Sequence, residues 1–482
     1  MSSKDLSPAD SRRWLALGVV ATAQLMIVLD LAVVFVALPQ MQTDLSISLA
    51  DRQWVVSGYA IAFGGLLLLG GRLVDYLGQK RMFLAALVGF AVASALGGLA
   101  DNGVQLFAAR ALQGAFAAVV APAVLSLISV TFTEQADRAR AFAVYGMVSG
   151  SGAAVGLLLG GVLTQYASWR WCLLVNVPIV LVTVVLAVAT LRPDPPAVKG
   201  RRYDLAGALT ATLGLVCLAN GLTLAEANGW ISVVTLGSLA AGVLLLGVFV
   251  LVEARSRQPL LPLRIVSEPH RALLYLAALL ANGAQLSMFL FLTFYFQNTR
   301  GYGAVQTGLA FLPFALAIIT TAQFSAPAVV RFGPLPVMSV GALTGAAGLF
   351  TLTRLGVDSP YPTAVLIPLV LIGVGVAMSL FPLNNVVLLG IDPKDAGVAS
   401  AVVSTTQQMG ASMVTALLNT LFAGAVAGYL LTRPSEGAAA TMHGYRVVFG
   451  WESALYLAAF VLILLAQRRV RRAVPDQVKA AA

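Results

Sequence analysis

The sequence predicts an all-α integral membrane protein with fourteen transmembrane helices. Hydrophobic residues make up 59% of the 482 residues and charged residues only 10%, whereas a soluble domain carries about 25% charged residues. The apolar residues form runs of about 20, the length that a spanning helix needs. Lys and Arg lie in the short segments between these runs, which explains the net charge of +10 by membrane orientation. We therefore expect contact with a lipid bilayer and not with nucleic acid.

Fourteen apolar runs follow one another along the chain. The first is long enough to span and has no small-residue cleavage site behind it, so it is not a signal peptide. The 45 glycines fit helices that pack closely inside a membrane. In chain order, the runs cover residues 14–38, 52–73, 82–100, 104–130, 140–164, 171–191, 204–225, 230–252, 271–297, 304–330, 335–354, 361–389, 396–427 and 447–466.

The distribution of basic residues predicts the orientation. With the N-terminus in the cytoplasm, 23 of the 30 Lys and Arg residues fall in cytoplasmic segments, six fall in external loops, and Arg110 lies inside a run. An even number of spans then places both termini in the cytoplasm. The excess of Arg over Lys, 25 to 5, is a compositional habit of GC-rich bacteria, so we expect the inner (plasma) membrane of a bacterium.

Two polar linkers, at residues 192–202 and 253–271, divide the chain. They enclose two runs, and removing this pair leaves six runs on each side. We therefore expect a six-helix bundle over residues 1–195, a two-helix insertion over 196–255, and a second six-helix bundle with a tail over 256–482. The turns at 71–81 and 327–334 each combine an arginine with a glycine, a weak sign of duplication. Six plus six helices around a midplane site is a common transporter plan.

Asp30 and Arg110 are the two ionisable residues that we expect deep within apolar runs. A charge at such a depth costs at least about 2.5–3.5 kcal/mol and is functional by default. Counting about 1.5 Å per residue from the outer helix ends places Asp30 about 12 Å deep and Arg110 about 9 Å deep, so the two can meet. One interpretation is a structural ion pair. The other is a protonation switch, because burial favours the neutral acid and a nearby guanidinium favours the ionised one.

The cytoplasmic turn at 71–81 has a specific pattern. It combines Gly71, Leu73, Asp75, Gly78, Lys80 and Arg81, with Arg72 between the first two. One interpretation is an ordinary cytoplasmic loop that is rich in basic residues. The pattern closely resembles the signature loop of the major facilitator superfamily, in which the aspartate holds the cytoplasmic side shut by facing a helix start in the other half. Here that helix start is near Ala396 and Gly397.

Further segments resemble the fourteen-helix drug:proton antiporter (DHA2-like) branch of that superfamily. Segment 29–39 with Asp30 is similar to its helix-1 motif, and segment 106–118 with Arg110, Gln113 and Gly114 to its helix-4 motif. Segments 53–59, which ends in Tyr59, and 295–313 are also typical of the branch. The resemblance covers nearly the whole chain. It implies the major facilitator fold, proton coupling and substrate contact at Asp30, Arg110 and Gln113, and a proton gradient in place of any cofactor.

The fifth run departs from the pattern of exporters of this type. Their motif ends Gly-Pro-x-x-Gly-Gly, and here Leu157 replaces the proline. The glycine face for close packing remains, formed by Gly152, Gly156, Gly160 and Gly161. The kink that proline gives a helix is not expected.

Uncharged polar residues form candidate walls of a substrate cavity. They are Tyr59, Asn282, Gln285, Asn384, Asn385, Ser404, Gln408, Ser412 and Thr415. Four of them, Ser404, Gln408, Ser412 and Thr415, lie on one face of the predicted helix at 396–427, together with Asn419. Hydrogen bonding between helices explains these polar residues as well as a place in the cavity wall does. The aromatic residues at 289, 291 and 294–296 favour a belt at the membrane interface over a cavity wall.

Three functions remain open at the level of sequence. The first is proton-coupled export of amphipathic small molecules such as antibiotics, dyes or cationic drugs, which the resemblance favours. The second is proton-coupled transport of a metabolite such as a sugar, an amino acid or a natural product precursor. The third, a receptor or scaffold, predicts a soluble domain, and no polar stretch is long enough for one. Two cysteines in apolar runs and two loop histidines suggest neither an enzyme nor a metal site. We expect a monomer.

Overall fold

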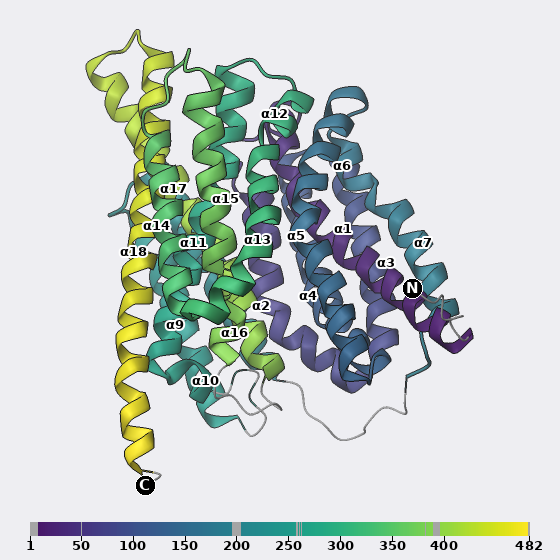
Figure 1. The fold of residues 1–482 in the computed structure, drawn as a ribbon. Helices are drawn as coiled ribbons and strands as arrows, with labels where there is room; N and C mark the ends of the chain where they lie inside the picture. The colour runs from purple at the N-terminus through teal and green to yellow at the C-terminus, as the bar shows by residue number, and fades with distance from the viewer. Residues whose placement is uncertain are drawn as a thin grey trace.

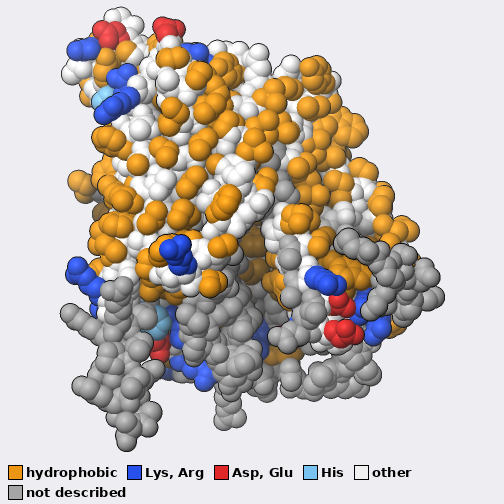
Figure 2. Space-filling view, viewed as in Figure 1, with side chains coloured by type: hydrophobic (Ala, Val, Ile, Leu, Met, Phe, Trp, Pro, Cys, Tyr) orange, Lys and Arg blue, Asp and Glu red, His pale blue; other side chains and the backbone are white. Residues whose placement is uncertain are grey.

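The computed structural model is an all-helical bundle (Figure 1) and describes residues 8–49, 51–194, 204–256, 259, 261, 263–380, 382–388 and 396–480. In Figure 1, α1 begins and α18 ends toward the lower side of the bundle. We call this side the terminal end and the other side the opposite end. Figure 2 shows hydrophobic side chains over the middle of one face, with charged side chains mainly toward its two ends, as a membrane-embedded surface requires.

The N-terminal bundle contains seven helical elements. They are α1 (Pro8–Asp44), α2 (Trp54–Leu77), α3 (Gln79–Gly98), α4 (Gly103–Thr131), α5 (Gln135–Tyr166), α6 (Arg170–Leu174) and α7 (Asn176–Thr190). The predicted run at 171–191 is thus broken near Val175 into α6 and α7. Among these helices, α1 packs on α5 and α7, while α4 packs between α2 and α3.

The insertion is a pair of helices, α8 (Leu205–Asn228) and α9 (Val233–Arg255), packed on each other. Asp204 and Ser232 cap the two helices by accepting backbone N–H bonds from Gly207 and Thr235. The first helix, α8, packs against both α2 and α17, so the pair covers one side of the contact between the two bundles. The second helix, α9, is mostly exposed, as expected where a helix faces lipid.

The C-terminal bundle repeats the plan with more interruptions. Its elements are α10 (Leu263–Ser267), α11 (Pro269–Phe294), η1 (Tyr295–Thr299), α12 (Ala304–Ala310), α13 (Leu312–Phe332), α14 (Pro334–Leu352), η2 (Pro362–Leu366), α15 (Ile367–Leu380), α16 (Leu383–Leu388), α17 (Ala396–Thr432) and α18 (Gly437–Ala480). Gly333, with φ of 83°, separates α13 from α14, as Gly78, with φ of 102°, separates α2 from α3. A glycine with positive φ therefore follows α2 in the first bundle and α13 in the second bundle.

The number of spans is the part of the fold on which sequence and structure differ. Within the described residues, eleven helices are long and apolar enough to cross a membrane, or twelve if the bent pair Trp54–Leu67 and Leu69–Leu77 is one span. Two shorter apolar stretches, Val155–Tyr166 in α5 and Ala206–Leu222 in α8, fall below that length. An all-helical membrane protein is therefore confirmed, and the count of fourteen stays a prediction.

The hydrophobic core shows where the two bundles meet. The first part of α1, from Ala16 to Ile27, shares a core with α3 and α4 of its own bundle. The later part, from Ala32 to Leu45, shares a core with α11, α17 and α18 of the C-terminal bundle. Because α1 starts at the terminal end, the two bundles pack tightly on each other at the opposite end.

The expected aromatic belt at 289–296 is wrong. Phe289, Phe291, Phe294, Tyr295 and Phe296 are all buried. Phe289 contacts Phe35 of α1 with ring centroids 5.6 Å apart, and Phe291 contacts Phe422 of α17 at 5.4 Å. A belt residue has to face lipid, whereas these consecutive aromatic residues cover several sides of one helix that neighbouring helices surround. The cluster therefore fills the contact between the bundles.

Candidate functional site

The two charges that the sequence places within the membrane form an ion pair. Arg110 Nη1 on α4 lies 2.5 Å from Asp30 Oδ2 on α1, and both side chains are fully buried, with 0% of their surface exposed. Arg110 also donates from Nε to the backbone oxygen of Val55 at 3.0 Å. The pair joins the start of α2 to the middle of α1 and α4.

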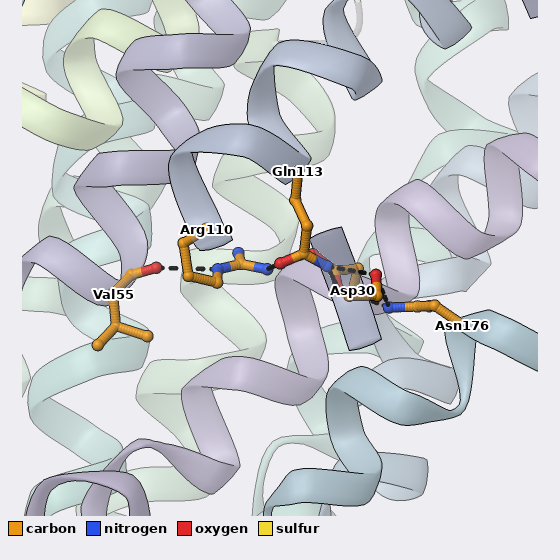
Figure 3. Close-up of polar contacts among 6 residues, drawn as sticks. Asp30, Val55, Arg110, Gln113 and Asn176 are labelled. Carbon is orange, nitrogen blue, oxygen red and sulfur yellow. Dashed lines mark hydrogen bonds and ion pairs between the residues drawn. The ribbon is translucent and has the colours of Figure 1, made fainter. Parts of the chain in front are cut away.

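Neutral amides complete the site around the carboxylate (Figure 3). Gln113 Nε2 and Asn176 Nδ2 both donate to Asp30 Oδ1, at 3.0 and 2.8 Å. Both amides also donate to Ser94 Oγ, at 2.6 and 3.3 Å. Gln113 accepts from Arg110 Nη1 at 2.9 Å, so one amide bridges acid and base. Asp30 thus accepts from three side chains on α4 and α7.

Tyr59 covers the guanidinium and does not face open space. Its ring lies under Arg110, with the guanidinium carbon 4.6 Å from the ring centroid, in cation–π contact. It also stacks on Phe63 at 5.9 Å. The close approach of α2 and α4 depends on Gly114, where a Cβ would lie 2.2 Å from the carbonyl oxygen of Tyr59. Tyr59 is therefore a wall of the charged site in this conformation.

This arrangement makes the buried charges of Asp30 and Arg110 depend on each other. A buried ion pair is costly to break from one side, about 3–5 kcal/mol, because the remaining charge loses its partner. A proton on Asp30 neutralises the acid, while Arg110 keeps its bond to Val55. The neutral amides adapt to either state, since each offers both a donor and an acceptor. Asp30, Arg110 and the two amides thus form one connected hydrogen-bond network.

The glycine face of α5 packs on α1, the helix that carries Asp30. A Cβ at Gly156 would lie 2.6 Å from Ala32 Cβ, and one at Gly160 would lie 2.8 Å from Val33 Cα. Gly152 approaches Val28 in the same way, and Gly161 instead approaches Ala304 of α12. No break in α5 occurs at Leu157, since one helix runs from Gln135 to Tyr166.

The signature turn between α2 and α3 is held by an acid that the sequence analysis missed. Asp194, after α7, accepts from the backbone nitrogens of Lys80 at 2.8 Å and Arg81 at 2.9 Å, which caps α3. A Cβ at Gly78 would lie 2.5 Å from Asp194 Oδ2, so only glycine fits there.

The remaining side chains of the turn point in several directions. Lys80 Nζ donates to the carbonyl oxygens of Val188 and Leu191. Arg72 donates to Pro259 O at 3.1 Å, a contact with the linker before the C-terminal bundle. Asp75 is exposed, and Gly71 lies close to Pro122 of α4. The surroundings expected for Asp75, near Ala396 and Gly397, adjoin residues 389–395, which lie outside the described residues.

The candidate cavity residues divide into two groups. Asn282, Gln285, Ser404 and Gln408 are partly exposed, and Asn282 donates to Gln407 O at 2.8 Å. Ser412 and Thr415 are buried, and Thr415 shares a hydrogen bond of 2.9 Å with Ser287 of α11. Thr415 therefore links helices in this conformation. The side chains of Asn384 and Asn385 lie outside the described residues.

Arg52, at the first position of the run at 52–73, is another buried arginine. Its guanidinium carbon lies 4.2 Å from the Phe294 ring centroid and 5.4 Å from that of Phe422. It also donates to Asn419 Oδ1 at 3.0 Å, and Asn419 donates to Leu49 O at 3.0 Å. Arg52 thus connects the N-terminal bundle with α11 and α17 at the opposite end.

The expectation that Asp30 is the one deep carboxylate is wrong. Glu452 of α18 is also fully buried, with 0% exposed. It lies near the start of the run at 447–466. The interior stripe of α18 carries it inward.

The sequence matches a known family over most of its length. Residues 20–416 match the Major Facilitator Superfamily. The puromycin resistance protein of Streptomyces alboniger is 44% identical over 94% of this chain and 91% of its own. The cephamycin export protein of Amycolatopsis lactamdurans is 41% identical over 86% of each chain.

A solved structure supports the same fold. The structure of a bacterial homolog of the human lysosomal transporter Spinster, inward-facing and unoccupied, aligns with a TM-score of 0.67 over 97% of this chain and 98% of its own, at 14% identity. At that identity the likeness shows the fold alone. Together with the match over residues 20–416 and the identity to the puromycin resistance protein, it shows that the chain belongs to the major facilitator superfamily.

Proposed function

We propose that this transporter exports amphipathic small molecules of the antibiotic type across a bacterial plasma membrane in exchange for protons. The observation that carries the proposal is the buried Asp30, which can lose and regain a proton without leaving its ring of donors. The names of the two relatives, puromycin resistance and cephamycin export, favour this function over transport of a metabolite.

Asp30 couples the two fluxes because proton and substrate compete for it. With a proton, the acid is neutral and no longer forms an ion pair with Arg110, which keeps its bond to Val55. Without it, the carboxylate offers a cationic or hydrogen-bonding substrate an acceptor. Arg110, 2.5 Å away, favours the ionised form and so allows release. The energy comes from the proton gradient, and no cofactor is required.

The terminal end faces the cytoplasm in this proposal. The basic segments support that orientation. Counting the bent α2 and the shorter apolar parts of α5 and α8 as spans gives fourteen crossings: six per bundle plus the inserted pair. Each bundle supplies one half of the transport path, so one chain is sufficient for transport as a monomer.

The turn at 71–81 controls closure of the cytoplasmic side. Asp194 holds its backbone, and exposed Asp75 offers a charge to the start of α17, where an anion gains typically 0.3–1 kcal/mol. Asp75→Asn is then expected to slow turnover more than it weakens substrate binding. A loss of affinity alone would place Asp75 in a binding site.

Substitution of Asp30 tests the proposal directly. Asp30→Asn keeps the shape and removes the titration, so proteoliposomes should lose the proton release that puromycin or ethidium induces, while the protein still inserts. Asp101→Asn, an exposed acid in the loop before α4, should behave as the wild type. Proton release that persists in Asp30→Asn would leave Asp30 and Arg110 as a structural pair.

A susceptibility panel separates the two substrate classes. A hypersusceptible host that expresses the chain should gain resistance to antibiotics, dyes or quaternary amines, and the Asp30→Asn protein should not provide it. Unchanged susceptibility, with proton-coupled uptake or efflux of a sugar or amino acid, would favour the metabolite transporter.

A further inference from the structure

Glu452 lies on the interior stripe of α18. This stripe repeats at helical spacing and is buried throughout; it consists of Glu452, Tyr456, Ala459, Ile463 and Ala466. The opposite face of the helix is exposed at Trp451, Leu457 and Val461, as a lipid-facing surface would be. The acid therefore points into the C-terminal bundle.

Neither carboxyl oxygen of Glu452 has a hydrogen-bond partner among the described residues, and the hydroxyl of Tyr456 has none either. The two residues are one helical turn apart on the same face. Such an arrangement is uncommon, because buried polar groups are nearly always hydrogen-bonded. An ionised carboxylate without a partner costs far more than a neutral one in apolar surroundings.

The helices around α18 supply no compensating charge near the acid. It packs on α11, α14 and α17. Over its described length α14 has no titratable side chain. The groups on α11 are His270, Arg271 and Tyr275, at its start, and α17 contributes Tyr429, near its last turn.

On α18 itself, three titratable residues precede Glu452 by six to nine residues, roughly two turns. They are His443, Tyr445 and Arg446, and Arg446 donates to Leu355 O at 2.9 Å. The basic residues that follow begin at Arg468, more than four turns further on. The described surroundings thus contain no base placed to pair with Glu452.

We propose that Glu452 is a second proton-binding carboxylate of the transporter and carries a proton in this conformation. A metal ion is a poor alternative, because one carboxyl and one hydroxyl give too few oxygen ligands for a hard cation. A proton needs a single oxygen. On release, the O–H bond of the carboxyl breaks, the proton passes to water and the carboxylate remains.

The contact between α18 and α14 allows the site to open. Tyr456 lies on Gly345, where a Cβ would be 2.6 Å from its ring. The hydroxyl of Ser453 donates to Ala346 O at 2.9 Å. Because Gly345 has no side chain to interlock with α18, a small shift between the two helices admits water to Glu452. Coupling of that shift to substrate rests on the proposed function, whereas protonation of Glu452 does not.

Infrared difference spectroscopy tests the protonation in reconstituted protein. The wild-type minus Glu452→Gln spectrum at neutral pH should contain the C=O band of a protonated carboxyl group. That band should weaken when puromycin is added or when the pH is raised. Ser453→Ala, which removes the hydrogen bond to α14 beside the acid, should keep the band.

Transport assays then separate this inference from the proposed function. Glu452→Gln should release fewer protons per puromycin than the wild type, while Asp30→Asn should release none. If the wild type shows no proton-coupled transport, the pH titration of the band still decides the case for Glu452. If Glu452→Gln does not insert, Glu452→Asp should move the band. A band that is absent, or that neither pH nor puromycin changes, would overturn the proposal.

Discussion

Asn176 connects α7 to Asp30 of α1 by a hydrogen bond. It stands at the first position of α7 and donates to Asp30 Oδ1 at 2.8 Å. A hydrogen bond to a charged group contributes about 1.5–3 kcal/mol. Because the donor stabilises the ionised carboxylate more than the neutral acid, Asn176 favours release of the proton.

Asn176→Ala should move the pH dependence of puromycin-induced proton release to higher pH. About 1.4 kcal/mol corresponds to a tenfold change in proton affinity, so the expected displacement is about one pH unit or somewhat more. Thr183→Val on the same helix is the matched control, since the Thr183 hydroxyl bonds only its own helix, at Ile179 O. An unchanged pH profile in Asn176→Ala would exclude this role.

The structure brings together the two residues that their charge makes conspicuous in the sequence. Asp30 and Arg110 stand out because ions are rare within apolar runs. Asn176 and Ser94 do not, since an uncharged polar residue costs little and has many structural uses. Arg52 and Glu452 lie toward the ends of their apolar runs, where hydropathy alone does not show whether a side chain is buried. Their burial depends on neighbouring helices that are distant in sequence.

At the scale of elements, the seam between α1 and α5 fixes the position of Asp30. Gly156 and Gly160 bring α5 against the backbone of α1 just beyond Asp30, and this contact needs no proline at Leu157. Spacing alone predicted the glycine face, whereas its partner could not be predicted, because periodicity does not say which helix lies opposite.

Gly156→Leu should destabilise the protein or displace α1. Overpacking typically costs 1–3 kcal/mol, so the thermal midpoint in detergent should fall and transport should be impaired. Gly146→Leu is the control on the same helix, because a Cβ there meets nothing within 4 Å. Equal stability of both variants would show that α5 does not depend on close packing at Gly156.

Arg52 links the two bundles at the opposite end. It rests on Phe294 and Phe422 and bonds Asn419, all of the C-terminal bundle. A cation–π contact contributes about 0.5–1 kcal/mol, or about 2 when desolvated. Its loss should therefore favour the conformation that is open at this end.

Spin labels on the external loops measure that opening. With labels at Asp101 and Asp358, one in each bundle, Arg52→Ala should increase the population with the longer distance by roughly tenfold, as about 1–2 kcal/mol implies. Arg170→Ala is the control, since Arg170 bonds Gly98 O and Ala100 O within its own bundle. A distance distribution identical to the wild type would show that Arg52 does not control closure.

At the scale of the whole molecule, composition and charge patterning were sufficient to predict the fold class. The division at the two linkers stays a prediction, and glycines with positive φ, Gly78 and Gly333, follow α2 and α13. The length of each span was harder to predict, because apolar runs show only where a helix is compatible with lipid. Short breaks such as that between α6 and α7 leave no mark on hydropathy.

Reporter fusions test the orientation and the even number of spans. A reporter after Ala482 and one within 432–445 should lie on opposite sides of the membrane, with the C-terminal reporter in the cytoplasm. The single crossing of α18 between them is the physical reason. Both reporters on one side would contradict the count of fourteen helices, and an external C-terminal reporter would contradict the predicted orientation.

The inserted pair has a consequence for how a lipophilic molecule enters. Because α8 touches both α2 and α17, one lateral seam between the bundles is screened from the bilayer, while α5 meets α12 and α13 along the other. A compound dissolved in lipid on the screened side encounters α9 before it can reach either bundle. Helix contacts thus close both lateral seams in this conformation, and a molecule that partitions into the membrane can pass through either seam only after these helices separate.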